Sequence, residues 1–499
     1  PSIVNSGIIK VGAKFEVPLD GVVKVKVDPS TVRTPSTAEV SALSDLSAKF
    51  LVSNSVKFIA PEFNIRDVTV TPDFTKGTSA KTYKLEDVFM PSLPGGGINS
   101  GIASVISQSY TWDATPITNS AGNVDIWMQK IEYGDLIKGY WYEDFGRALD
   151  EKYENAEGEA LKIFNKIDLL ENEGDFKHIM SGLGGNIYAN INQREDDITK
   201  TFENAMDFIE TSQNNTKENV KVNIIGGKGK TNEDTDGVVG YDYTTAGVLG
   251  LREVERTYKH TFGYSLGYLH TGFEFNDGNE SEEWVDTVQL GIHSKYTLND
   301  WKLRNDLTGR VSFHNVDRNL DWPSPTGRSE MNVTYETYSI TSDNILGKEF
   351  ALGKNTSVTP YGALRAMYVT RPAFEEEGLE RLQVEGNDAW SVKPRVGVEL
   401  KAGIPLGPKT AWQLKGTLDF AYEYELADMN EKENARLVAI EDGYHQLAKP
   451  EEENGQFRTR ASFGFEAADR YGIFLNGEYS ISDHGQDEYK AGKTLKAVF

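Results

Sequence analysis

Three stretches of the chain contain residue types that occur in binding or catalytic sites, but none of them has a complete motif. Residues 228–231 (Lys-Gly-Lys-Thr) resemble the end of a phosphate-binding loop, but Ile224 stands where the first glycine of such a loop belongs. Residues 232–237 are acidic like a calcium loop, but the twelfth position lacks the glutamate that binds through both oxygens. Asn214 and Asn215 form a pair, and the simplest interpretation of Asn-Asn in a linker is a turn.

The remaining sequence offers no catalytic or metal-binding spacing. There is no Cys, no Gly-x-Ser-x-Gly motif and no His-Glu-x-x-His motif. The seven histidines are scattered: His178, His260, His270, His293, His314, His445 and His484. The sequence therefore predicts no catalytic residue, no metal and no cofactor in this chain, although an upstream segment could still be an enzyme.

Bulk composition narrows the class of protein. The chain has 499 residues and a formal net charge of −24, from 52 Lys and Arg against 76 Asp and Glu. This balance argues against nucleic acid as a partner, because phosphate neutralisation needs clustered cations. No stretch reaches the roughly 18 apolar residues that a transmembrane helix needs. The start, Pro1 to Val4, is not a signal peptide, so we expect either a processed chain or the C-terminal piece of a longer one.

Strands with strict alternation dominate the second half of the sequence. From Trp412 to Leu426, the apolar residues share one face and residues such as Lys415 and Glu423 share the other. The alternation continues for about fifteen residues, whereas soluble strands average about five or six. Such a strand fits an outer-membrane barrel, in which only every second residue touches lipid.

The pattern recurs twelve times, an even number as in bacterial single-chain barrels. The candidate strands begin near Val220, Tyr241, Phe262, Trp284, Trp301, Tyr335, Val358, Val392, Trp412, Phe457, Tyr471 and Tyr489. Four tryptophans (Trp284, Trp301, Trp390 and Trp412) lie at strand beginnings, where interfacial girdles place amphipathic rings. The alternative to a membrane barrel is a soluble β-sandwich with one solvent-exposed face, but sandwiches have shorter strands.

The polar faces of these strands would line the barrel lumen. The lumen charges that we select are Arg304, Arg310, Lys393, Arg395, Lys415 and Glu423. Some connections are short, such as 299–300, and others are long and acidic, such as 427–456. Short turns on one side and long loops on the other are typical of such barrels.

A helix precedes the first strand. Over 194–213 the apolar residues recur at helical spacing: Ile198, Phe202, Ala205, Met206 and Ile209. It either packs on the barrel end or threads through the lumen. The sequence thus predicts four parts: a β-rich end of a β-solenoid or β-sandwich (1–135), a helical junction (136–193), the helix and its linker (194–217) and the barrel (218–499). The predicted fold is all-β, a 12-stranded antiparallel transmembrane barrel plugged by an α-helix.

This order of parts resembles the C-terminus of a type Va autotransporter. Residues 237–247 (GVVGYDYTTAG) look like the second strand of that family, and residues 262–268 (FGYSLGY) look like its third. Residues 186–194 (NIYANINQR) and 141–145 (WYEDF) look most like the large fusobacterial autotransporter adhesins such as RadD. The resemblance is specific over about 135–499 and weaker before it.

The resemblance implies a translocator in the bacterial outer membrane that exports its own N-terminal passenger and anchors it on the cell surface. It implies insertion by the barrel-assembly machinery, which reads the last strand, here Tyr489, Ala491, Leu495, Ala497 and Phe499. It also implies a monomeric barrel in outer-membrane lipid, with an adhesin passenger that binds other cells.

Some family members cut themselves at an Asn pair, so Asn214 and Asn215 carry a second interpretation, with a lumen Asp or Glu as the assisting group. An outer-membrane enzyme, such as a surface protease or esterase, and a plain diffusion porin remain the alternatives.

Overall fold

The computed structural model describes residues 2–18, 20–27, 31–41, 50–71, 80–93, 102–210, 218–231, 237–441, 443–450, 455–468, 470–483 and 487–498. The chain divides into two compact units. The first unit comprises residues 1–184 with 320–329 and 436–445, and the second comprises 185–319, 330–435 and 446–499.

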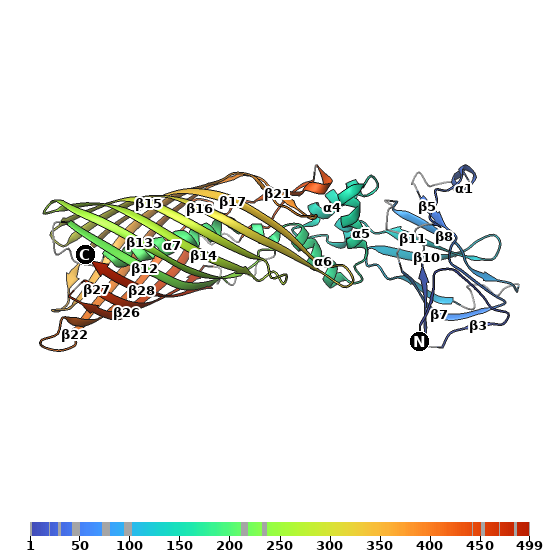
Figure 1. The fold of residues 1–499 in the computed structure, drawn as a ribbon, viewed down its shortest axis with the longest axis horizontal. Coiled ribbons are helices and arrows are strands. Elements are labelled where there is room, and N and C mark those ends of the chain that lie inside the picture. The colour runs from blue at the N-terminus through green and yellow to red at the C-terminus, as the bar shows by residue number, and fades with distance from the viewer. Residues whose placement is uncertain are drawn as a thin grey trace. The chain divides into compact units, whose positions relative to one another are not determined.

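The first unit begins with short strands in two sheets (Figure 1). The elements are β1 (Ser2–Asn5), β2 (Ile8–Lys10), β3 (Phe15–Glu16), β4 (Val22–Lys26), α1 (Thr37–Ser41), β5 (Phe50–Ser53), β6 (Lys57–Ala60), β7 (Phe63–Thr71), β8 (Thr82–Pro91), β9 (Ile102–Ser107), β10 (Trp112–Thr118) and β11 (Val124–Lys130). Successive strands pair in parallel in both sheets, as in β1-β4-β7 and β2-β6-β8. The strands β10 and β11 form an antiparallel hairpin instead.

Phenylalanines from the two sheets meet between them. Phe15 of β3 contacts Phe58 of β6 with ring centroids 5.5 Å apart, and Phe58 stacks on Phe89 of β8 at 5.1 Å. All three side chains are buried. Aromatic contacts of this kind bury large areas, so they hold the two sheets together.

Four helices follow in the same unit: α3 (Tyr133–Leu136), α4 (Glu143–Tyr153), α5 (Gly158–Asp168) and α6 (Glu173–Leu183). Each of the three longer helices buries one apolar face, at helical spacing. Two distant segments complete this helical module. The Lys166 ammonium of α5 lies 5.3 Å from the ring centroid of Trp322, and Nε2 of His445 lies 2.7 Å from the carbonyl oxygen of Gly184.

The second unit is a closed antiparallel barrel. Its sheet has 13 strands, of which β18 (Phe350–Ala351) is a two-residue strand beside β19, and the other twelve form the wall. These are β12 (Glu218–Thr231), β13 (Tyr241–Thr257), β14 (His260–Phe275), β15 (Glu282–Leu298), β16 (Trp301–Trp322), β17 (Gly327–Lys348), β19 (Thr356–Arg371), β22 (Asn387–Pro405), β23 (Trp412–Tyr424), β26 (Gly455–Ala467), β27 (Tyr471–Ser482) and β28 (Asp487–Val498). The first and last strands pair from Lys221↔Val498 to Thr231↔Glu488, which closes the barrel. The predicted twelve-stranded antiparallel barrel is confirmed.

Burial on these strands is the reverse of that in a water-soluble protein. On β23, Leu418 and Phe420 are 44% and 40% exposed, whereas Asp419 and Ala421, which alternate with them, are each 2% exposed. Leu266 of β14 is 59% exposed beside Ser265 at 4%. An apolar band of this extent is found where a surface meets lipid, so the soluble-sandwich alternative is wrong.

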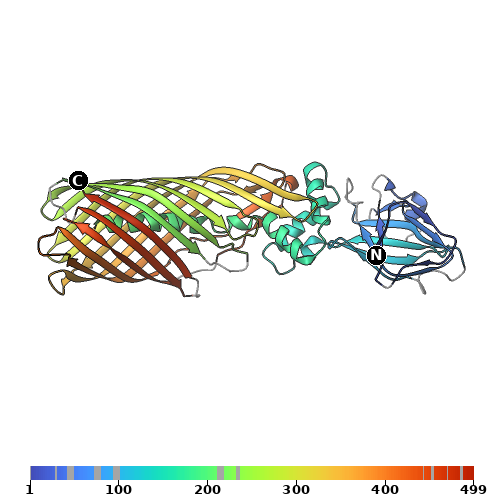
Figure 2. The ribbon, with the colours of Figure 1, turned by 60° about the horizontal axis from the view of Figure 1, so that its bottom comes forward.

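The barrel contains a helix, α7 (Ile191–Glu210), which both ribbon views show inside the ring of strands (Figures 1 and 2). It begins three residues earlier than the sequence predicted, because the 3-10 turn η3 (Asn186–Tyr188) leads directly into it and the amide of Arg194 already donates to the carbonyl of Asn190. The predicted end at residue 213 falls outside the described residues. The lumen alternative for this helix is therefore correct, and the end-packing alternative is wrong.

Two long loops build a second, small sheet that the sequence did not predict. Its strands are β20 (Phe374–Glu375), β21 (Leu382–Val384), β24 (Asn434–Leu437) and β25 (Tyr444–Gln446), with the short helix η4 (Val438–Ile440) after β24. Two- to four-residue strands are too short to show alternation, and we expected only an acidic loop over 427–456.

Candidate functional site

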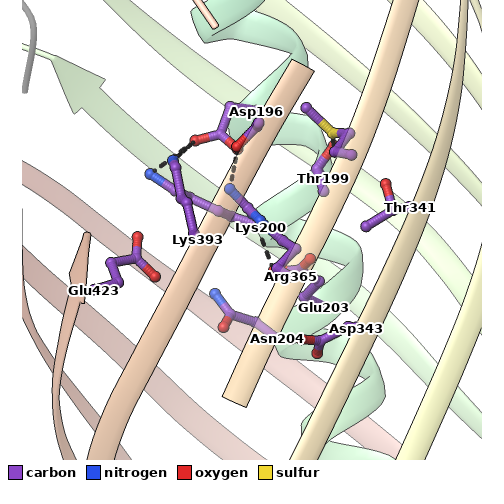
Figure 3. Close-up of polar contacts among 12 residues, drawn as sticks. Asp196, Thr199, Lys200, Glu203, Asn204, Thr341, Asp343, Arg365, Lys393 and Glu423 are labelled. Atoms are coloured by element: carbon purple, nitrogen blue, oxygen red, sulfur yellow. Dashed lines mark hydrogen bonds and ion pairs between the residues drawn. The ribbon is translucent and has the colours of Figure 1, made fainter. Parts of the chain in front are cut away.

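The helix inside the barrel carries a row of carboxylates, and cationic side chains of the surrounding wall pair with them (Figure 3). The carboxylates of α7 that pair with the wall are Glu195, Asp196, Asp197, Glu203 and Asp207. Their partners on the wall are His314 of β16, Arg304 of β16, Arg365 of β19, Lys393 of β22, Arg460 of β26 and Lys490 of β28. The contacts therefore come from five strands around the ring.

Asp196 is the most heavily paired of these carboxylates. Its oxygens lie 2.6 Å from the Arg365 guanidinium, 3.0 Å from the Lys393 ammonium and 3.2 Å from the Lys200 ammonium one turn along α7. Arg365 also reaches Glu203 at 3.2 Å, so it bridges two turns of the helix. Figure 3 shows these side chains converging between α7 and the neighbouring strands. Removing one member of a buried pair leaves an uncompensated charge, so the arrangement fixes the helix strongly.

The first turn of α7 is held by a second network. Nε of Arg194 lies 2.6 Å from Glu283 of β15. Glu283 accepts from Nδ1 of His314 at 2.6 Å, and Nε2 of the same ring lies 2.9 Å from Glu195. The hydroxyl of Thr337 donates to Glu195 at 2.7 Å. Every member of this network is almost completely buried.

The last turns of α7 are held by side chains of β16, β26 and β27. Asp207 pairs with Arg460 at 2.8 Å and with Arg304. The Asn204 amide donates to Glu478 at 3.0 Å and accepts from Arg460 at 2.7 Å. The helix is thus anchored along its whole described length.

The apolar residues that predicted this helix are also buried in the lumen: Ile198, Phe202, Ala205, Met206 and Ile209, each 5% exposed or less. Phe202 lies against Gly267 of β14, where an added Cβ would stand 2.6 Å from the ring. A glycine at this lumen position therefore makes room for the aromatic ring.

The six predicted lumen charges occupy two kinds of position. Arg304 and Lys393 contact the helix as described above. The others pair with the wall: Arg310 donates to Ser339 and Gln289, Arg395 lies 3.9 Å from Glu423, and Lys415 pairs with Glu466. Sequence reasoning missed His314, Arg365, Arg460 and Lys490, although each lies on the polar face of a predicted strand.

The helix does not fill the lumen completely. A cavity of about 160 Å³ lies beside its C-terminal half, against β12, β23 and β26 to β28. Small residues line much of it, among them Ala205, Gly227, Ala461, Gly477 and Gly492. Polar groups such as Asp419 and Glu478 also border the cavity, so it can hold water.

On the last strand, Tyr489 and Leu495 are 51% and 43% exposed on the outer surface, and Ala491 is exposed and Ala497 half-buried. Phe499 and the pair Asn214 and Asn215 lie outside the described residues, so their predicted roles stay predictions.

Within the described ranges, no group of three His, Asp or Glu side chains is arranged to hold a metal ion. Over the same residues, no helix combines the length and the apolarity that crossing a bilayer requires.

Comparisons with known proteins identify the class. The autotransporter β-domain family matches residues 220–478, which is more than half of the chain, and the chain belongs to this family. The BigA β-sandwich domain family matches residues 45–132. The barrel is therefore a translocator of the bacterial outer membrane, of the class that holds a passenger at the cell surface.

One curated relative is BigA of Salmonella typhimurium (strain LT2), a protein named for surface exposure and virulence. It is 23% identical over 365 residues, a match that covers 71% of this chain and 17% of BigA. The chain therefore spans about a sixth of that relative.

Solved autotransporter barrels are also similar. The NalP translocator domain from Neisseria meningitidis is 12% identical with a TM-score of 0.46, covering 62% of this chain and 98% of that domain. The Bordetella BrkA β-domain is 12% identical with a TM-score of 0.39, covering 56% of this chain and 99% of that domain. The Escherichia coli AIDA-I transport unit is 12% identical with a TM-score of 0.37, covering 60% of this chain and 98% of that transport unit.

Proposed function

We propose that residues 218–499 support export of the chain's own N-terminal passenger and then anchor it, and that α7 is the retained end of the exported segment. The observation that carries this proposal is the pairing of the helix carboxylates with cationic side chains on five strands of the wall. A helix that had merely drifted into a preformed pore would not meet matched partners on five strands. Buried carboxylates without such partners would be costly.

We further propose that the passenger is an adhesin and that the chain is not an enzyme. The naming of BigA for surface exposure and virulence supports a role at the cell surface. The resemblance of residues 186–194 to fusobacterial adhesins such as RadD supports a passenger that binds other cells. The lumen carboxylates are engaged in ion pairs with cations, so they do not form the free acid and base that hydrolysis needs.

A diffusion porin is the less favoured candidate, since α7 occupies the lumen that a porin keeps open. The partners that follow from the proposal are outer-membrane lipid on the apolar band and the barrel-assembly machinery on the last strand. We propose a monomeric barrel and no nucleic-acid partner, in keeping with the net charge of −24.

The proposal is tested by expressing the chain behind an export signal in a Gram-negative host, with an epitope before residue 2. Protease added to intact cells should remove the epitope while residues 218–499 stay protected in the membrane. A matched chain that ends at residue 217 should show no surface epitope. Surface display without the barrel, or an epitope inaccessible with it, would reject the translocator.

The adhesin is tested on the native surface protein. Mass spectrometry should find a polypeptide much larger than 55.5 kDa, and cells that lack it should lose attachment to other cells. Unchanged attachment in the deletion strain would reject the adhesin while leaving the translocator in place.

A further inference from the structure

The segment before α7 contacts three loops that are far apart in sequence. The Asn190 amide donates to the Val239 carbonyl at 2.7 Å, in the loop between β12 and β13. The Asn192 amide donates to the Met429 carbonyl at 2.9 Å, in the loop between β23 and β26. Tyr188 contacts the third loop, between β19 and β22. One short segment, 185–192, thus joins all three.

Tyr188 completes a buried polar network in the third loop. Its hydroxyl donates to Glu376 at 2.6 Å. The same carboxylate receives the Arg318 guanidinium at 2.7 and 2.6 Å and the amide of Leu382 at 2.7 Å. Tyr188, Arg318, Glu376 and Leu382 are each 2% exposed or less. Buried networks of this kind are stable when every member is satisfied.

Aromatic packing extends the network to the second loop. The Tyr188 ring meets Phe374 edge-on at 5.3 Å, and the Arg371 guanidinium lies 5.1 Å from the centre of Phe374. Arg371 in turn pairs with Glu433 at 2.6 Å. The two longest loops are therefore tied to each other through side chains that pack around Tyr188.

Gly185 allows this close approach. Its φ is +91°, a conformation that side-chain-bearing residues rarely adopt. An added Cβ would also stand 2.7 Å from the Leu382 side chain.

We propose that these three loops are a latch: residues 237–240, 372–386 and 425–435 fold around residues 185–192, and they do so only once export has brought this segment to the outer mouth of the barrel. Because side chains of the segment form part of the loops' core, the folded loops and the seated segment stabilise each other. The latch then bears part of any mechanical force on the passenger, so that less of this force is transmitted along the chain to α7. This role for the segment rests on the proposed function, since it requires a chain that travels through the barrel.

The test measures trypsin cleavage after Arg381 in the full chain, in isolated outer membranes. Arg381 is the only Lys or Arg in residues 372–386, and the backbone beside it is held by hydrogen bonds between Glu376 and Leu382. Cleavage needs local opening of this loop, so its rate follows the open population. We expect Tyr188→Ala to raise the rate about tenfold and Tyr188→Phe, which keeps the ring, about threefold. Tyr258→Ala, at an 81% exposed turn tyrosine, should leave it unchanged.

Heat-modifiable gel migration shows whether each barrel is assembled. An unchanged Arg381 rate in assembled Tyr188→Ala or Tyr188→Phe protein would overturn the latch. If the Tyr188→Ala barrel does not assemble, the latch is judged from the rate of cleavage after Arg381 in Tyr188→Phe. Protease shaving of intact cells reports the passenger separately: a displayed passenger with an unchanged Arg381 rate rejects only the latch, whereas a passenger absent from the surface in the unaltered protein rejects the translocator.

Discussion

Individual lumen carboxylates do more than add charge, and Asp196 is the clearest case. It faces three cations in a site that is almost completely closed to solvent. Neutralising it leaves Arg365, Lys393 and Lys200 without their shared counter-ion, and breaking a buried pair in this way costs about 3–5 kcal/mol. Asp196→Asn should therefore loosen α7 and raise the ion current through single barrels in planar bilayers. Glu151→Gln, at an exposed position on α4, should leave the current unchanged. Equal currents in the two variants would contradict a structural role for Asp196.

His445 makes one contact of the helical module sensitive to pH. Burial lowers the pKa of this histidine below its ordinary 6.5, and its neutral ring contacts the carbonyl of Gly184. A lowered pKa means that His445 binds a proton more readily when its ring has left the buried site beside Gly184. The contact is therefore fully stable above about pH 6.5 and weakens as the pH falls below that value.

Hydrogen exchange at the amides of Tyr444 and His445 should accordingly quicken between about pH 7 and pH 5.5, after correction for the intrinsic rate. His445→Gln keeps an N–H donor but does not titrate, so its corrected exchange should be the same at both pH values. A variant that keeps the full pH dependence would show that another group is responsible.

At the scale of elements, the strand pair β12–β28 is where the barrel closes, and glycines on it differ in the space around them. A Cβ on Gly492 would stand 2.6 Å from the carbonyl oxygen of Gly226, whereas a Cβ on Gly226 would meet nothing within 4 Å. Gly492→Ala should thus force the backbone to shift, at a cost of about 1–3 kcal/mol. It should lower the temperature at which the barrel unfolds on a heat-modifiable gel. Gly226→Ala is the matched control, and equal midpoints for the two variants would count against this packing.

The strands were predictable from the sequence because of their period-two alternation, which is strong in β23 from Trp412 and weaker in strands such as β12 and β28. The helix was predictable from Ile198, Phe202 and Ile209 for the same reason, at the helical period. Its place in the lumen was not predictable, because a helix with one apolar face packs equally well on the outside of a barrel end. The small sheet of β20, β21, β24 and β25 was missed, since its strands are set by tertiary contacts such as that of Glu376 with Leu382.

The candidate site was predictable only as a set of wall charges. Alternation places Arg365, Arg460 and Lys490 on the polar face, just as it places Arg304 there. It does not show which of these residues lies at the height of which turn of α7. That depends on the stagger between strands, which the pairing register fixes and the sequence pattern does not. The sequence of residues 186–194 resembles a family signature, but it does not show that Tyr188, Asn190 and Asn192 contact three different loops.

For the whole molecule, the distribution of polar groups explains why an acidic chain of ordinary hydropathy belongs in a membrane. The apolar side chains of the wall face outward, and the charged ones are paired inside, some with one another and some with the helix in the lumen. The barrel therefore needs α7 to satisfy its own interior, and α7 needs the barrel to satisfy its carboxylates. The same complementarity accounts for retention of the exported segment once it has folded into a helix.

Single-channel recording in planar bilayers tests this complementarity most directly. The full chain is compared with a chain that lacks residues 186–210, after gel migration has shown that both barrels are folded. We predict a small current for the full chain, carried by the cavity beside α7, and a several-fold larger one for the deletion. Equal currents from two folded barrels would mean that the helix does not close the pore.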